Sequence, residues 1–235
     1  MQHRKKLYFS ALFCALAPVF LAGCDIPLGT PQERLFKAAK NDYERNMRRL
    51  LDSGVDPNTV DSAGWTPLMW AAAKDNVSVI RILLSRGAQL ELRNKKGETA
   101  LHIASRWSRL ETVKFLMDNG ARTEARDRLG WPPLMWAAMQ GRTEVVEALA
   151  RGGANLDFKD TNGNTPLMMG ANRGRTEAVK ALLDLGANPF KTNAEGKTAG
   201  ELARFNGYGE LAALIDGGGA AATAPKPAGR TKGPR

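Results

Sequence analysis

Cysteine and histidine are almost absent from this chain, which has two of each in 235 residues. Both cysteines, Cys14 and Cys24, lie within the first 24 residues, so the remainder has no disulfide framework, CxxC redox pair or cysteine zinc site. His102 is the single histidine of that remainder. It has no second histidine or cysteine to complete a metal site and no partner for a nucleophile. We therefore predict no metal, no cofactor and no catalytic residue.

Net positive charge is small in the middle of the chain, although the formal net charge of the whole is +10. Three positive charges lie within residues 4–6 and four within residues 226–235, and neither end carries an acid. The rest is left with +10 − 3 − 4 = +3. A high pI that belongs mostly to the two ends is a poor argument for nucleic-acid binding. We expect no nucleic-acid partner.

A long apolar run is also missing. Residues 7–20 are nearly all apolar, but a membrane-spanning helix needs about 20 such residues. The basic start, the short apolar stretch and the small residues that follow are typical of a secretory signal peptide, here residues 1–23. Leu21-Ala22-Gly23-Cys24 resembles the bacterial lipobox, which implies cleavage before Cys24 and acylation of its thiol. Residues 24–31 would then be a short tether, and Asp25 resembles a signal for retention in the inner membrane.

Glycine, in contrast, recurs at a fixed interval. Two series are each 33 residues apart: Gly64, Gly97, Gly130, Gly163 and Gly196, and Gly54, Gly87, Gly120, Gly153 and Gly186. Leucine recurs in the same register at residues 68, 101, 134 and 167, and alanine at 71, 104 and 137. A period of this length is the signature of a stacked-repeat protein.

The repeated segments Thr66-Pro67-Leu68, Thr99-Ala100-Leu101-His102 and Thr165-Pro166-Leu167 resemble the T-P-L-H element of the ankyrin repeat. The resemblance implies an all-α ankyrin-repeat solenoid of stacked helix-turn-helix units with β-turn fingers, over residues 32–216. Four full units are 61–93, 94–126, 127–159 and 160–192. Residues 32–60 and 193–216 would cap the two ends.

Local signals agree with these units. Thr30-Pro31-Gln32-Glu33 has the pattern of a capping box, with proline in the first turn. Asp75 and Ser108 occupy the turn position that Gly141 fills in a later unit, so we expect the first two full units to be less stable locally. Residues 217–235 contain no apolar side chain larger than alanine, and we predict a disordered basic tail.

Candidate acid groups have a structural explanation. Asp61, Asp127 and Asp160 share one repeat position, where aspartate favours a turn. His102 matches the structural histidine of the family. The chain lacks a Walker loop and a Rossmann fingerprint, because its glycines follow the repeat period instead. The sequence therefore predicts that the protein is not an enzyme.

Tryptophan is more informative for binding. Trp65 and Trp131 follow the turn glycines, where the resemblance implies side chains that project from the fingers, and Trp107 lies on an inner helix. Trp70 and Trp136 are expected to stabilise loops instead. Exposed aromatic residues rimmed by arginine are typical of a protein-binding hot spot. The predicted binding residues are Trp65, Lys74, Lys95, Lys96, Arg106, Trp107, Arg128, Trp131, Met139, Asn164 and Arg173.

We thus predict a monomeric, lipid-anchored, periplasm-facing module that binds a protein through its concave face and fingers. The partner could be a toxin that an immunity protein neutralises, or an envelope enzyme that needs an accessory protein. A cell-wall or lipid-acting enzyme and a structural protein that tethers peptidoglycan through its basic tail remain as alternatives.

Overall fold

The computed structural model describes residues 29–222 and, for side chains, residues 29–217; over this range the secondary structure is twelve α-helices. The predicted signal peptide, Cys24, Asp25 and the charged end of the tail lie outside the described residues. The helices are α1 (Pro31–Lys40), α2 (Glu44–Asp52), α3 (Pro67–Lys74), α4 (Val77–Ser85), α5 (Ala100–Arg106), α6 (Leu110–Asp118), α7 (Pro133–Gln140), α8 (Thr143–Arg151), α9 (Pro166–Asn172), α10 (Thr176–Asp184), α11 (Ala199–Phe205) and α12 (Gly209–Ala222).

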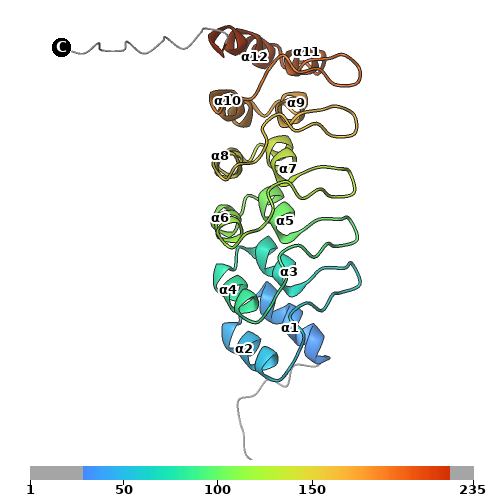
Figure 1. Ribbon diagram of the computed structural model, residues 1–235, viewed down its shortest axis with the longest axis vertical. Helices are drawn as coiled ribbons and strands as arrows, with labels where there is room; N and C mark the ends of the chain where they lie inside the picture. The colour runs from blue at the N-terminus through green and yellow to red at the C-terminus, as the bar shows by residue number, and fades with distance from the viewer. Residues whose placement is uncertain (1–28, 223–235) are drawn as a thin grey trace, which may run out of the picture.

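The helices form six pairs that stack in chain order into an elongated solenoid (Figure 1). The first helix of each pair packs on the first helix of the next, from α1 on α3 to α9 on α11. The second helices form a parallel column from α2 to α12. The connecting loops extend to the side away from this second column (Figure 1). The predicted all-α repeat solenoid is confirmed.

Each first helix begins with a threonine or proline signal that the sequence carries. The Thr66 hydroxyl accepts a hydrogen bond from the Met69 amide, and Pro67 occupies the first turn, where its missing N–H leaves no donor unpaired. At the start of α1, Thr30 and Glu33 form the predicted capping box: the Thr30 amide donates to the Glu33 carboxylate at 2.8 Å.

The repeated leucines and alanines form the core. Leu68, Leu101, Leu134 and Leu167 are each 1% exposed, and Ala71, Ala104 and Ala137 are fully buried. Small alanine side chains let neighbouring helices approach closely, and the leucines fill the space between units. Since one unit cannot cover its own apolar face, stability comes from stacking.

The turns between the paired helices use the left-handed region, as predicted. Asp75 has φ 63° and Ser108 φ 59°, close to the 70° of Gly141. Only glycine adopts this conformation without a steric penalty. Asp42, in the turn between α1 and α2, has φ 58°, so three of these turns hold a non-glycine residue that is strained there.

The predicted start of the disordered tail at residue 217 is wrong, because α12 continues to Ala222. Its first turns are anchored by Leu211, Ala212 and Ile215, all buried. Once a helix is nucleated, each further residue needs little extra free energy, and alanine is the best helix former. The alanines that follow the glycines therefore extend a helix that is already packed.

Candidate protein-binding surface

Five loop segments, here called the fingers, connect successive units: residues 61–65, 94–98, 127–131, 160–164 and 193–197. Each is closed by a backbone bond between its ends, such as Asp61 N to Trp65 O at 3.0 Å. The Asp61 carboxylate accepts from two amides within its finger, and Asp127 and Asp160 do the same. Their role in turn formation is confirmed.

Neighbouring fingers are also tied to each other. The Lys95 amide donates to the Ala63 carbonyl at 3.2 Å, and the Arg128 amide donates to the Lys96 carbonyl at 3.0 Å. These bonds join the tips of the first three fingers through their backbones. The side chains of Lys95, Lys96 and Arg128 are exposed, so the row presents cations on a fixed frame.

Trp65 and Trp131 do not project from the fingers as expected. Both are only partly exposed, and their rings pack on Trp70 and Trp136, with centroids 4.5 and 5.0 Å apart. The Trp131 indole N–H donates to Asp160 of the next finger at 3.1 Å. An indole ring whose face packs on a second indole and whose N–H is hydrogen-bonded nearby is more stable there than exposed to water.

Trp70 and Trp136 stabilise the loops, as the sequence predicted. Their indole N–H groups donate to Asp61 at 2.9 Å and to Asp127 at 2.7 Å. Lys40 of the preceding unit lies over the Trp70 ring at 3.7 Å, a cation–π contact across the unit boundary.

Arg106 is also less available than predicted. Its guanidinium pairs with Glu98 at 2.8 Å, and it lies 5.2 Å from the Trp136 ring centroid. The side chains of Arg106 and Glu98 are 19% and 2% exposed. Breaking such a buried pair leaves a charge without compensation, so Arg106 belongs mainly to the fold.

His102 has the structural role that the resemblance implied. Its Nδ1 accepts from the Thr99 amide at 3.2 Å, and Nε2 donates to the carbonyl of Trp131 in the next unit at 3.0 Å. Burial lowers the pKa of His102, although the hydrogen bond to Trp131 opposes this effect. A neutral imidazole satisfies both bonds, and it links two units.

The remaining predicted residues separate into two groups. Lys95, Lys96 and Arg128 are on the fingers, whereas Lys74, Trp107 and Arg173 are exposed at the ends of first helices, beside the turns to the second helices. Trp107 is 43% exposed. Two further residues are partly buried: Met139 packs against a small core cluster, and Asn164 bonds to Asn193. The structure does not bring the predicted set into one site.

Three arginines that were not predicted from the sequence lie beside Lys74, Trp107 and Arg173. Arg109, Arg142 and Arg175 directly precede the second helices of three successive units. Each donates its Nε to a carbonyl of the preceding unit: Ala73, Arg106 and Met139, at 2.9, 3.2 and 3.2 Å. Their own spacing of 33 residues was the signal that could have identified them.

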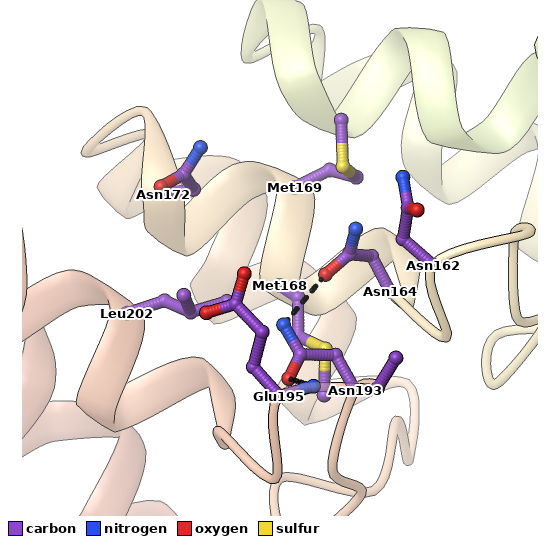
Figure 2. Close-up of a pocket in the computed structure, with 9 residues that line it drawn as sticks. Asn162, Asn164, Met168, Met169, Asn172, Asn193, Glu195 and Leu202 are labelled. Carbon is purple, nitrogen blue, oxygen red and sulfur yellow. Dashed lines mark hydrogen bonds between the residues drawn. The ribbon is translucent and has the colours of Figure 1, made fainter.

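A hollow of about 390 Å³ lies between the fourth full unit and the last (Figure 2). Its apolar lining residues are Met168, Met169, Ala194 and Leu202, amides come from Asn162, Asn164, Asn172 and Asn193, and Glu195 is its one charged lining residue. The Asn193 amide donates to Asn164 at 3.0 Å, so these two side chains are already committed to each other (Figure 2). The hollow has no charged pair suited to acid–base chemistry.

Between residues 29 and 222, no helix has both the length and the apolar character needed to cross a bilayer. Over the same residues, no three histidine, cysteine, aspartate or glutamate side chains converge as metal ligands.

Stacked helical hairpins with a row of tied fingers and exposed basic and aromatic side chains define a helical-repeat protein. A family model described as ankyrin repeats (3 copies) matches residues 35–127 and 122–193. The chain therefore belongs to the ankyrin-repeat family, as the T-P-L-H segments indicated. No curated protein matches it. Ankyrin repeats are generally protein-binding modules and are typically not catalytic.

Proposed function

We propose that this chain is a lipid-anchored, periplasm-facing ankyrin-repeat protein that binds one protein partner through its concave face and fingers. One observation carries the binding proposal. Exposed lysine and arginine side chains, together with an exposed tryptophan, are held on a frame whose units are joined by hydrogen bonds. A frame that is ordered before binding loses less conformational entropy when the complex forms.

The anchor proposal rests on the lipobox-like segment that ends at Cys24. Several acyl chains hold a protein at a membrane far better than one, since each buried methylene contributes about 0.8 kcal/mol. Thr30 caps α1 only a few residues later, so the solenoid would be close to the bilayer surface. Asp25 favours the inner membrane.

In-cell photo-crosslinking tests the binding proposal. A photoreactive residue is placed at the exposed fingertip position Ser62, and a control is placed at Asp118, which ends a second helix. Mass spectrometry should identify one protein crosslinked at residue 62 and not at residue 118. Equal labelling at both positions, or no adduct at either, contradicts the proposal.

Partner type follows from the strength of the complex. Nanomolar inhibition of one toxin enzyme would identify an immunity protein, whereas weaker association with a resident envelope enzyme would identify an accessory protein.

Cell fractionation of Cys24→Ser tests the anchor separately. We expect soluble protein or uncleaved precursor, and unchanged membrane association contradicts the anchor.

A further inference from the structure

One edge of the solenoid combines unpaired cations with an exposed aromatic ring. It follows the ends of the first helices and the turns after them, and we call it the turn edge: Lys74, Trp107, Arg109, Arg142, Arg173 and Arg175. Among the described residues, none of these five cations forms an ion pair. Glu111 and Glu177, which follow Arg109 and Arg175 closely in the chain, pair instead with Lys114 and Lys180 of their own helices. The positive charge of the turn edge is left for a partner.

Three arginines of the turn edge, Arg109, Arg142 and Arg175, are held in place. Because the Nε of each bonds to a carbonyl of the preceding unit, the guanidinium plane is fixed while its terminal nitrogens make no hydrogen bond within the described residues. Arginine fixed in this way offers two donors in the geometry that a carboxylate accepts.

Trp107 gives this edge an aromatic contact. A shallow depression of about 320 Å³ is lined by Trp107, Arg106, Gln140 and Arg142. Tryptophan and arginine are the residue types that contribute most to binding free energy at protein interfaces. The depression therefore suits an apolar side chain flanked by acids.

The spacing of the cations selects the form of the partner. Packed helices are about 10 Å apart, so equivalent residues of successive units recur at roughly that distance along the edge. An extended peptide in the polyproline II conformation has three residues per turn and advances about 3.1 Å per residue, which puts every third side chain on the same face, about 9 Å from the last. A duplex carries one phosphate charge per about 1.7 Å, far denser than this row.

We propose that the turn edge binds an extended acidic segment of a protein, with carboxylates at every third residue; this rests on the proposed protein-binding function. The aromatic side chain of Trp107 contacts the segment between two carboxylates. Fingers and concave face then add contacts with the folded body of the same partner.

Fluorescence anisotropy with a labelled peptide of about five Glu-Ser-Ser triplets, long enough to cover the edge, tests this directly. The control peptide has the same composition with its glutamates in one block. The protein is the full chain and its variant Lys74→Glu/Arg173→Glu, whose two side chains make no hydrogen bond or ion pair in the described structure. A matched variant, Arg49→Glu/Arg122→Glu, makes the same change in net charge at exposed residues away from the edge.

We expect the edge variant to bind the spaced peptide at least about tenfold more weakly, equivalent to about 1.4 kcal/mol, and the matched variant to bind within about twofold of the original chain. Equal loss in both variants, or equal binding of the blocked peptide, overturns the proposal. Tighter edge-dependent binding of phosphatidylglycerol vesicles or of a DNA duplex also overturns it. If the peptide does not bind while residue 62 still crosslinks to one protein, only the turn-edge inference fails.

Discussion

One repeat position shows how a neighbouring side chain selects between aspartate and asparagine. One oxygen of Asp127 accepts from two finger amides and the other from the Trp136 indole N–H at 2.7 Å, so both must be acceptors and a carboxylate is needed there. Asn94 occupies the same position one unit earlier and donates its amide to Glu98 at 2.7 Å. A carboxylate at residue 94 would face a second carboxylate. Whether this position holds aspartate or asparagine therefore depends on the side chain that bonds to it in each finger.

His102 is the residue whose protonation should affect stability. Its Nδ1 accepts from the Thr99 amide at 3.2 Å, so a second proton on the ring would break this bond and could be accepted only by the Thr99 hydroxyl, 2.9 Å away. Burial lowers the pKa of His102 in the folded state from its ordinary value of 6.5, and the unfolded chain therefore binds more protons over the interval between the two values. Stability is fully present above pH 6.5 and falls as the pH decreases towards the lowered pKa.

We expect the free energy of unfolding to decrease between about pH 7.5 and 5.5, with a slope that approaches at most about 1.4 kcal/mol per pH unit. The His102→Gln variant should have a lower free energy of unfolding at neutral pH. That free energy should also no longer show the decrease with falling pH that His102 contributes. Urea unfolding of both chains across this range measures the difference. Because both chains retain His3, parallel pH profiles would show that His102 does not titrate in the expected way.

At the scale of the helical hairpin, the left-handed turn residues differ in how their strain is offset. Asp75 accepts from the Thr112 hydroxyl at 2.7 Å, a bond between successive units. Ser108 has the same backbone conformation, but its side chain makes no hydrogen bond within the described structure. The expectation that the first two full units are both locally less stable is untested. Because only Asp75 gains a bond to a neighbouring unit, we now expect lower local stability only in the unit that contains Ser108.

Ser108→Gly should therefore raise the free energy of unfolding by about 1 kcal/mol, because glycine removes the left-handed penalty. Asp75→Gly removes the same penalty together with the bond to Thr112, and we expect no gain or a net loss. Urea unfolding of the two variants beside the original chain measures both values. A larger gain for Asp75→Gly than for Ser108→Gly would contradict this explanation.

The repeat units and their turns could be predicted from the sequence because a fixed period puts equivalent residues in equivalent surroundings. The positions of side chains whose surroundings differ from unit to unit could not be predicted in this way. Trp65 and Trp131 fold back because Trp70 and Trp136 are next to them, and Arg106 is held by Glu98. Such pairings depend on distances across the fingers, which a repeat pattern does not contain. The start of the tail was missed because a helix already packed at Ile215 extends through residues that would not begin one.

At the scale of the whole molecule, the core runs along the length of the solenoid, since each first helix packs against the first helices of the adjacent units. Stability is then a sum over neighbours, and a defect should act according to its place in the stack. Leu35 and Leu134 provide a matched comparison because they are three periods apart, at one repeat position, and are 0% and 1% exposed.

Each change to alanine should remove about 2–5 kcal/mol of local stability. In Leu35→Ala the terminal hairpin of α1 and α2 has neighbours on one side only, so it should fray alone. Leu134→Ala is in α7, between α5 and α9, and should weaken both interfaces and lower protection on either side of the defect. Hydrogen–deuterium exchange with peptide-level mass spectrometry separates the two cases. Uniform loss of protection from α1 to α12 in Leu35→Ala would mean that the six hairpins unfold as one cooperative body, contrary to a nearest-neighbour stack.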